Sequence, residues 1–504
     1  MKTPIVLVIA TAALYACSGP ARQSENTPLE AHRLHFHFSP KTSWMNDPNG
    51  MVYHNGTYHL FFQHNPDSTV WGPMHWGHAT STDLVHWEEQ PIGLYPDSLG
   101  TIFSGSAVVD KNNTAGFGND ALIAIFTHHN HTIEREKTGL HQYQSIAYST
   151  DNGKTWAKYA GNPVLPNPGI QDFRDPKVMW HEETNQWIMT LATKQTITFY
   201  ASPNLKEWEK LSEFGVGIGA HGGVWECPDL IRFDHNGENV WVLLVSINPG
   251  GPNGGSATQY FVGDFDGTAF TPYTTDTKWL DYGRDNYAGV TWSNADDRRI
   301  FIGWMNNWDY ANVVPTKTWR GAATVARDLT IRQIEGNWYV ASKPVAELGA
   351  ITELLHEVPQ QVVRSNASLK SITGSLPATY RLDFTARADR DFTVRLKNDN
   401  KEWADFGYRA TDRQFFVDRT SSGDHSFSDR FASIDSASRI DTADYIEVSL
   451  LVDVASLEAF ADGGLVVMTE TFFPTTDFND VVLQGETDQV FTDLRISRMT
   501  SIWK

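Results

Sequence analysis

Short runs of branched and aromatic residues recur along the first two thirds of the chain, separated by polar stretches. Five of these runs have similar composition and begin 54 to 65 residues apart: Tyr58–Gln63, Ala121–Phe126, Gln186–Leu191, Val240–Val245 and Arg299–Trp304. Each run is short and rich in residues that favour β-structure, which is typical of a buried strand. Because repetition at a regular period indicates repeated supersecondary units, the pattern predicts five related β units.

A second motif predicts a tight turn in most of these units. Ser-Thr-Asp or Ser-Pro-Asn is followed by Trp within 81–87, 149–156 and 202–208, and a looser copy lies at 263–270. Asp and Asn favour turns, and Trp favours the strand that follows. Units that hold several strands and turns fit the blades of a β-propeller. We therefore predict a five-bladed β-propeller over residues 32–345. A solenoid fits less well, because long and varied insertions separate the strands.

The last third of the chain has a different pattern. Between 361 and 504, apolar and polar residues alternate in short segments such as Tyr380–Thr385 and Tyr445–Val452. Such alternation, with polar turns between segments, is typical of an antiparallel β-sandwich. Helical periodicity is confined to a stretch near 344–356. We thus predict an all-β chain, a propeller followed by a sandwich, with residues 346–360 as the linker.

The first residues resemble an export signal followed by a tether. An apolar run over 4–16 is too short for a permanent membrane helix, and it ends in Leu14-Tyr15-Ala16-Cys17. This ending resembles a bacterial lipobox. It implies a lipoprotein signal peptide over 1–17, a lipid on Cys17, and an exported protein at the outer membrane, the cell surface or the periplasmic face. An ordinary signal peptide with an incidental cysteine is the alternative. Residues 18–31 are polar and contain proline, which predicts a flexible tether.

Composition narrows the range of partners. The formal net charge of −20 argues against nucleic acid, because phosphate binding depends on basic patches. The 18 Trp and 17 Tyr suit stacking on neutral sugars, although most such rings pack in cores. The chain has two cysteines, so Cys227 has no internal disulfide partner if Cys17 carries lipid. The membrane is therefore expected as a partner through the anchor only.

Three carboxylates occupy similar places in different units. Asp47 lies in Trp-Met-Asn-Asp-Pro-Asn-Gly, Asp175 in Phe-Arg-Asp-Pro and Glu226 in Trp-Glu-Cys-Pro. Each acid lies 11 to 14 residues ahead of a repeated run and precedes a proline by one or two positions. Because the first strands of propeller blades line a central channel, we expect the three acids to meet in one pocket. Arg174 would keep Asp175 ionised, and Trp225 would desolvate Glu226.

Clustered carboxylates indicate chemistry, because each raises the proton affinity of its neighbours at a cost to stability. Glycoside hydrolysis requires such a pair, one acid protonated and the other ionised. The alternative is that the Asp-Pro and Glu-Cys-Pro motifs only mark turns. A metal is not expected, because His128-His-Asn-His131 lacks partner carboxylates at a set spacing. No other cofactor is expected either.

The motifs around the acids resemble those of glycoside hydrolase family 32, which holds invertases, inulinases and levanases. Four blocks occur in order, at 44–50, 103–107, 174–176 and 226–228, and Leu451–Phe460 is similar to the sandwich of that family. The resemblance covers nearly all of the chain after the predicted signal peptide. It implies retaining hydrolysis of β-fructofuranosidic bonds. Asp47 matches the nucleophile, Glu226 the general acid/base, and Asp175 the carboxylate that holds fructose hydroxyls and stabilises the transition state.

The resemblance also implies which residues bind the substrate. Six fall where the family lines its fructose subsite: Asn46, Gln63, Trp71, Phe103, Ser104 and Arg174. The stretch 303–311 and Trp319-Arg-Gly321 look more like fructan-degrading members than sucrose-specific invertases. Trp308 and Trp319 are candidates for stacking on a second sugar or for packing in the core. The family's frequent Pro-Arg-Glu-Leu is Ala326-Arg-Asp-Leu329 in this chain, a departure expected to affect packing only.

We therefore expect an exo-acting hydrolase that releases fructose from levan or inulin and also accepts sucrose. An endo-levanase that releases fructo-oligosaccharides is the first alternative. An inverting arabinan or xylan hydrolase with five blades is a second, which the block at 44–50 disfavours. A non-catalytic glycan-binding propeller at the cell surface is a third, but such a module does not need three acids.

Overall fold

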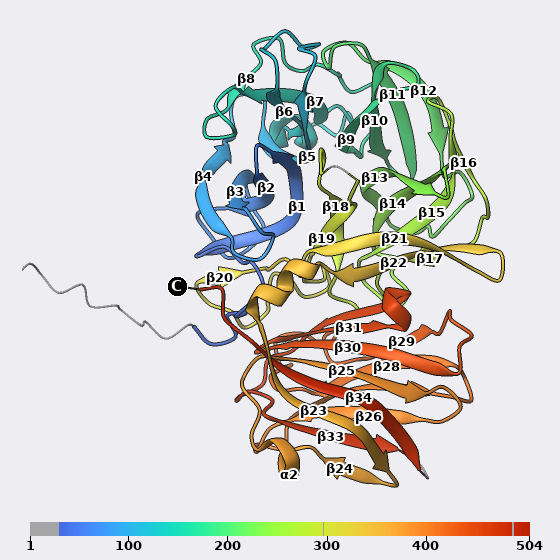
Figure 1. Cartoon of the computed structure of the whole chain (residues 1–504). Coiled ribbons are helices and arrows are strands. Elements are labelled where there is room, and N and C mark those ends of the chain that lie inside the picture. Colours follow the sequence, from blue (N-terminus) through green and yellow to red (C-terminus); the bar gives the residue numbers. More distant parts are fainter. Residues whose placement is uncertain (1–29, 296, 486–487, 504) are drawn as a thin grey trace, which may run out of the picture. The chain divides into compact units, whose positions relative to one another are not determined.

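The computed structural model of the protein describes residues 30–295, 297–485 and 488–503. Within these residues the strands form seven sheets, five in the N-terminal part and two in the C-terminal part (Figure 1). The predicted signal peptide, Cys17 and residues 18–29 of the predicted tether lie outside the described residues. The helices within the described ranges are all too short or too polar to span a membrane.

The five N-terminal sheets are built mainly from antiparallel strands that follow one another along the chain. The first sheet contains β1 (Ser43–His54), β2 (Thr57–Asn65), β3 (His75–Ser81) and β4 (Glu88–Leu94), with β20 (Trp319–Arg320) parallel to β1. The second contains β5 (Thr101–Asp110), β6 (Ala121–His129), β7 (Gln142–Ser149) and β8 (Ala157–Lys158). The third contains β9 (Phe173–His181), β10 (Gln186–Thr193), β11 (Thr196–Ser202) and β12 (Glu209–Phe214). The fourth contains β13 (Val224–His235), β14 (Glu238–Asn248), β15 (Ala257–Phe265), β16 (Phe270–Pro272) and β17 (Lys278–Trp279). The fifth contains β18 (Tyr287–Thr291), β19 (Ile300–Trp304), β21 (Arg327–Ile334) and β22 (Asn337–Pro344).

The five repeated apolar runs are the second strands of these sheets, β2, β6, β10, β14 and β19, so the predicted strands are confirmed. These strands lie between two neighbours and are almost entirely buried; all nine residues of β6 are buried. Burial on both faces explains why the runs read as continuous apolar segments and do not alternate.

The predicted turns are also present. In the turn between β3 and β4, the carboxylate of Asp83 accepts hydrogen bonds from the backbone N–H groups of Val85 and His86. Between β11 and β12, Asn204 Oδ1 accepts hydrogen bonds from the backbone N–H groups of Lys206 and Glu207 in the same way. Asp and Asn recur at these positions because a short side-chain acceptor can satisfy the N–H groups of a turn.

The first strands of the five sheets contact one another in chain order. β1 contacts β5, β5 contacts β9, β9 contacts β13 and β13 contacts β18, while β18 returns to contact β1. A bridge between Val52 and Ser293 joins the first and fifth sheets, and Figure 1 shows the sheets succeeding one another around these strands. Residues far apart in the sequence therefore face a common central region.

The C-terminal part is a β-sandwich, as predicted. One six-stranded sheet has the order β23 (Thr352–Val363), β34 (Gln489–Met499), β25 (Tyr380–Arg387), β30 (Tyr445–Asp453), β31 (Ser456–Ala461) and β32 (Val466–Thr471). The other has the order β24 (Asn366–Ser368), β33 (Asp480–Gly485), β26 (Phe392–Lys397), β27 (Trp403–Arg409), β28 (Gln414–Ser421) and β29 (Ile434–Ser438). Alternate side chains of both sheets, such as Leu382, Val394, Phe406 and Leu450, form one apolar core.

In the part of the chain that the structure describes, four short helical elements connect the strands: α1 (His131–Arg135), η1 (Ala346–Ile351), α2 (Lys370–Thr373) and η2 (Asp462–Gly464). The range 346–360, expected to be a linker, holds η1 and most of β23. β23 pairs along its length with β34, so the chain enters the sandwich sheet at Thr352.

Candidate active site

A cavity of about 360 Å³ opens where the first strands of the N-terminal sheets meet. Asp47 from β1, Asp175 from β9 and Glu226 from β13 all line it. A second cavity, of about 410 Å³, lies elsewhere around Lys177 and Asp229 and contains none of the three acids. Three carboxylates from three sheets thus share one cavity.

Each acid lies at an irregularity in its strand. The pairing of β1 with β2 shifts register between Asn46 and Pro48, and that of β13 with β14 shifts between Glu226 and Asp229. The pairings of β5, β9 and β18 with their second strands also contain a shift. A bulge bends its strand and re-aims a side chain, which accounts for the convergence of these side chains on the cavity.

In the three strands that carry the acids, two of the bulges contain a residue other than glycine in the left-handed region, Asp175 with φ 65° and Cys227 with φ 46°. Both residues precede a proline, and a left-handed residue other than glycine costs roughly 1 kcal/mol or more. Proteins keep such strain mainly where function needs the geometry.

Asp47 is held by two donors. Asn46 Nδ2 donates to Asp47 Oδ1 at 2.8 Å, and Ser104 Oγ donates to Asp47 Oδ2 at 2.8 Å. Burial, together with the nearby charge of Glu226, raises the pKa of Asp47 to about 6, although both hydrogen bonds lower it. Asp47 is therefore fixed in one orientation and destabilised as a carboxylate.

Asp175 is almost completely buried. Its Oδ2 accepts a hydrogen bond from the backbone N–H of Cys227 at 3.1 Å and lies 4.0 Å from Arg174 Nε. Burial raises the pKa of Asp175, and the charges of Glu226 and Asp47 add to this effect. Arg174 lies beside Asp175 and lowers this pKa, which is the predicted direction, but it lowers the pKa by less than burial raises it.

Glu226 accepts hydrogen bonds at both of its carboxylate oxygens. Arg174 donates to its Oε1 through Nε at 3.2 Å and Nη2 at 2.9 Å, and the Tyr287 hydroxyl donates to its Oε2. The Trp225 ring is completely buried in the apolar core between the third and fourth sheets, and its desolvation of Glu226 stays a prediction. The aromatic side chain that donates a hydrogen bond to the carboxylate is that of Tyr287.

Seven of the eight predicted substrate-binding residues line the cavity: Asn46, Gln63, Trp71, Phe103, Ser104, Arg174 and Trp308. Among Trp71, Phe103 and Trp308, Trp71 is the most open, with 39% of its surface exposed. The Nε2 atom of Gln63 is buried without a hydrogen-bond partner among the described residues, so it is available to a ligand. Trp308 stacks on Trp44 with its ring centroid 6.0 Å away.

Trp319 does not line the cavity, so its predicted stacking on a second sugar is not supported. Its ring is 4% exposed and packs with Leu34 and Met305, while the Arg33 guanidinium lies 4.5 Å from its centroid. β20 pairs in parallel with β1, and this pairing directs Trp319 into the packing at the edge of the first sheet.

Comparison with known proteins agrees with this geometry. The model of the glycosyl hydrolases family 32 N-terminal domain matches residues 37–343, and that of the family 32 C terminal matches residues 351–498. The chain belongs to glycosyl hydrolase family 32.

Relatives in family 32 match over nearly the whole chain. A levanase of Bacillus subtilis (strain 168) is 43% identical over 491 residues, 94% of this chain and 71% of the levanase. An extracellular exo-inulinase of Aspergillus ficuum is 39% identical over 520 residues, 94% of this chain and 96% of the relative. The crystal structure of exo-inulinase from Aspergillus awamori superposes with a TM-score of 0.86 at 36% identity, covering 94% of this chain and 99% of that chain.

Several residues of this family 32 site were not singled out from the sequence. Tyr287 contacts Glu226, but the fifth repeat has no Asp-Pro or Glu-Cys-Pro motif at this place to mark it. The Cys227 thiol lies 3.7 Å from Asp47 Oδ2 and 3.7 Å from Asp175 Oδ2. Burial raises the pKa of this thiol well above its usual value, so it stays protonated between the two carboxylates.

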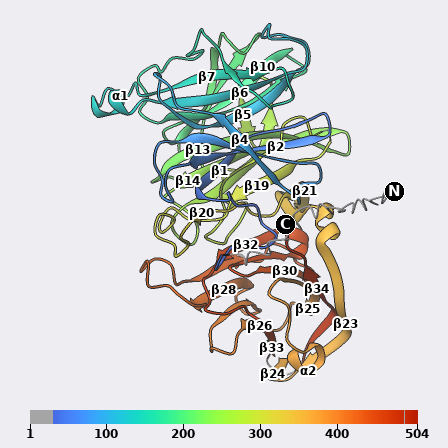
Figure 2. The same ribbon diagram turned by 90° about the vertical axis from the view of Figure 1, so that its left-hand side faces the viewer.

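A polar wall of the cavity comes from the segment that carries α1, which projects from the second sheet (Figure 2). Here Glu134 Oε2 lies 3.0 Å from His129 Nε2 and 3.1 Å from His131 Nδ1, and the three side chains could together hold a metal ion. The structure thus supplies a carboxylate that the sequence pattern lacked.

The hydrogen bonds around His129 favour a network over a metal site. Gln142 Oε1 accepts the backbone N–H of Phe173 at 2.8 Å, so its Nε2 donates to His129 Nδ1 at 3.2 Å. The proton of the neutral His129 ring then lies on Nε2, directed at Glu134, and leaves no lone pair there for a metal. That no metal is needed stays a prediction.

Proposed function

We propose that the protein is a retaining, exo-acting β-fructofuranosidase that releases fructose from levan or inulin and also cleaves sucrose. The observation that carries this proposal is the pairing of Asp47 and Glu226 on one cavity in different surroundings. Both carboxyl groups are partly buried, but Asp47 receives hydrogen bonds from the neutral donors Asn46 and Ser104, whereas Glu226 is held by the Arg174 guanidinium and the Tyr287 hydroxyl. Two carboxyl groups in unlike environments suit the two roles of glycoside hydrolysis.

In the proposed reaction, the Asp47 carboxylate attacks the anomeric carbon C2 of a terminal fructosyl unit. The bond from C2 to the leaving oxygen breaks, and Glu226 donates its proton to that oxygen. A covalent fructosyl ester on Asp47 results. Glu226, now ionised, removes a proton from water, and the hydroxide oxygen displaces Asp47 from C2. Two inversions give net retention.

Asp175 and Arg174 complete this proposal. Asp175 accepts hydrogen bonds from fructose hydroxyls and stabilises positive charge that develops at the ring in the transition state. Arg174 bridges Glu226 at 2.9 Å and Asp172 at 2.7 Å, which keeps the acid/base in one orientation. The free donor of Gln63 and the ring of Trp71 contribute sugar contacts at the cavity wall.

We propose the exo mode because the cavity, about 360 Å³, lies at the small end of the range for small-molecule sites. Such a volume favours a chain end over the middle of a polymer. The named relatives, a levanase and exo-inulinases, support fructan as the substrate class. An endo-levanase that releases oligosaccharides remains the alternative.

We also propose that the five N-terminal sheets are the blades of a β-propeller over residues 32–345. The order of contacts among the first strands supports this, with β18 returning to β1. The sandwich would extend over 361–504, and β23, which begins before residue 361, adds a strand to one of its sheets.

For localisation, we propose export and anchoring through a lipid on Cys17, tested by release of a Cys17→Ala variant from membranes.

The function is tested by sizing the products from levan, inulin and sucrose over time, in the parent and in Asp47→Asn and Glu226→Gln variants. We expect fructose alone from the first time point, and a loss of kcat of about 1,000-fold in each variant. Glu183→Gln, a change at a half-exposed surface carboxylate, is the matched control and should keep full activity. An early ladder of oligosaccharides would indicate endo action, and an active Glu226→Gln enzyme would refute the mechanism.

A further inference from the structure

The segment that leads into Tyr287 lies against the C-terminal sandwich. Residues 281–286 precede β18 and belong to no strand. The backbone N–H of Tyr282 donates to Val467 O at 2.8 Å, and that of Asp285 donates to Thr469 O at 3.0 Å. Both acceptors belong to β32, which is an edge strand of its sheet. The segment therefore covers an edge whose backbone groups would otherwise lack partners.

Two buried aspartates of this segment grip β32 in the same way. Asp281 accepts hydrogen bonds from the backbone N–H of Thr469 at 2.9 Å and from its Oγ1 at 2.6 Å. Asp285 accepts from the N–H of Thr471 at 2.8 Å and from its Oγ1 at 2.9 Å. Each threonine thus donates two hydrogen bonds to one carboxylate, one from its backbone N–H and one from its hydroxyl. The residues just before Tyr287 are held in place from the sandwich.

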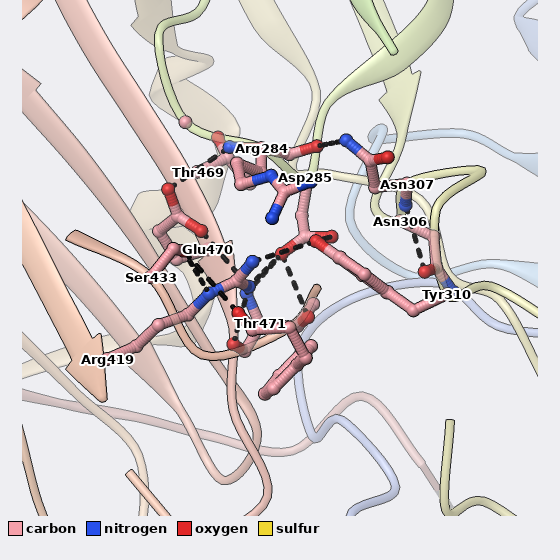
Figure 3. Close-up of polar contacts among 12 residues, drawn as sticks. Arg284, Asp285, Asn306, Asn307, Tyr310, Arg419, Ser433, Thr469, Glu470 and Thr471 are labelled. Carbon is pink, nitrogen blue, oxygen red and sulfur yellow. Dashed lines mark hydrogen bonds and ion pairs between the residues drawn. The ribbon is translucent and has the colours of Figure 1, made fainter. Parts of the chain in front are cut away.

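Arg419, from β28 in the second sheet of the sandwich, completes this contact (Figure 3). Its Nη1 donates to Asp285 Oδ2 at 2.6 Å, and its Nη2 donates to the Tyr310 hydroxyl at 2.9 Å. Tyr310 in turn donates to Asp285 Oδ1 at 2.7 Å. Arg419 and Asp285 are completely buried, so water does not compete with these charge-assisted hydrogen bonds.

A second pair ties the neighbouring residues to the sandwich. Arg284 Nη2 lies 2.5 Å from Asp309 Oδ2, and the backbone N–H of Arg284 donates to Glu470 Oε1 at 3.1 Å. Arg430 from the sandwich reaches the other oxygen of Asp309 at 2.8 Å. Arg284 and Asp285 are consequently both fixed, three and two residues ahead of Tyr287.

The domains have other contacts that hold them together. Trp44 and Trp304 share an apolar cluster with Leu451 and Phe460 of the sandwich. Arg327 pairs with Glu458 without involving residues 284–287. What distinguishes the contacts of Arg419 is their place in the chain, because they fix the residues that set the position of Tyr287.

We infer that the sandwich is a working part of the active site: Arg419, through Asp285, is a positioning residue that holds the Tyr287 hydroxyl on Glu226. The inference rests on the proposed role of Glu226. It predicts that a loosened contact in the sandwich changes the chemical step through Tyr287, although no residue of the sandwich lines the cavity among the described residues.

The test is a double-mutant cycle on the full-length enzyme with sucrose as substrate. Arg419→Lys shortens the guanidinium fork, and Tyr287→Phe removes the hydroxyl that contacts Glu226. We expect each single variant to lower kcat about tenfold, with KM changed less than about threefold. In the Tyr287→Phe background, Arg419→Lys should lower kcat by less than about twofold. Equal losses in both backgrounds, or an unchanged kcat in folded Arg419→Lys, would overturn the inference.

Two further variants keep the test sharp. Thr471→Val removes the Oγ1 contact of Asp285 with little change in volume, and it serves if Arg419→Lys does not fold. Arg439→Lys is the matched control, because this buried arginine pairs with Asp462 within the sandwich and should leave kcat unchanged. An active Glu226→Gln variant would contradict the proposed function itself. An inactive Glu226→Gln variant with additive Arg419 and Tyr287 effects would contradict only this inference.

Discussion

At the scale of single residues, the surroundings of Asp47 disfavour its ionised form. Burial and the charge of Glu226 raise its pKa to about 6, and the hydrogen bonds from Asn46 and Ser104 offset part of that rise. A nucleophile must be ionised at the working pH, yet a fully stabilised carboxylate attacks poorly. The two donors therefore balance ionisation against reactivity.

This balance predicts the behaviour of a Ser104→Ala variant. Because Ser104 lowers the pKa of Asp47, its removal lets that pKa rise above about 6. The proposed attack by Asp47 needs its ionised form, so we expect kcat/KM to fall as the pH drops through this pKa. The acidic limb of the kcat/KM profile should therefore shift to higher pH, while activity at alkaline pH changes less. The measurement is a pH series of initial rates on sucrose.

Ser106 provides the control for this prediction. It lies on the same strand, but its Oγ donates to Pro176 O at 2.9 Å and not to Asp47. Ser106→Ala should leave the acidic limb in place. A limb that stays fixed or moves to lower pH in Ser104→Ala would contradict the assigned role of that hydrogen bond.

At the scale of elements, two loops form the open rim of the cavity, and Arg320 of β20 joins them. Its Nη1 donates to Thr69 O at 3.0 Å and to Asn312 O, and its Nη2 donates to Val314 O at 2.8 Å. The loop of Thr69 carries Trp71, and the backbone N–H of Trp71 donates to Asn312 Oδ1 at 2.9 Å. The buried Arg320 guanidinium thus sets the distance between the two loops of the rim.

We predict that Arg320→Lys raises KM for levan or inulin about threefold to tenfold and lowers kcat much less. A lysine has a single nitrogen and cannot reach carbonyls on both loops in a fixed fork, so the Trp71 rim would loosen. Steady-state kinetics on the polymer and on sucrose would measure the effect. Arg298→Lys, at a half-exposed ion pair with Asp328, is the control. A loss confined to kcat would show that the rim does not act in binding.

The sequence predicted the strands and turns better than the register shifts within the strands. Continuous apolar runs and Asp or Asn turns report local physics, and the second strands and turns of the sheets followed from them. The register shifts depend on the partner strand, so no local rule placed Tyr287 beside Glu226 or turned Trp225 into the core. For the same reason, aromatic composition alone did not separate Trp308, which lines the cavity, from Trp319, which packs beside β1.

At the scale of the whole molecule, buried ionic contacts join segments that lie hundreds of residues apart. His37 Nδ1 lies 2.8 Å from Asp453 Oδ2, and His37 Nε2 lies 2.8 Å from Glu458 Oε1. Glu458 also accepts from Arg327 at the start of β21. Residues from both ends of the described chain therefore meet at the sandwich. Such pairings are invisible in the sequence, because nothing local marks a histidine that is charged and buried.

The charge of His37 predicts how stability depends on pH. Burial alone would lower its pKa, but the hydrogen bonds and charges of Asp453 and Glu458 outweigh burial and raise the pKa from 6.5 to about 9. A group with a higher pKa in the folded state stabilises the fold fully below its unfolded pKa. That contribution is lost as the pH rises through about 9.

We therefore predict that His37→Gln lowers the free energy of unfolding by roughly 3 kcal/mol near pH 6, since it removes the cation beside the buried Asp453 and leaves Glu458 with Arg327 only. The difference between variant and parent should shrink as the pH approaches 10, because the parent loses its charge there. Denaturant unfolding at pH 6, 8 and 10 measures both effects, with the exposed His425→Gln as control. If the difference were the same at all three pH values, packing and not the charge of His37 would account for it. A large difference near pH 6 that vanishes near pH 10 would instead mean that the N-terminal segment is held on the sandwich by a protonated histidine.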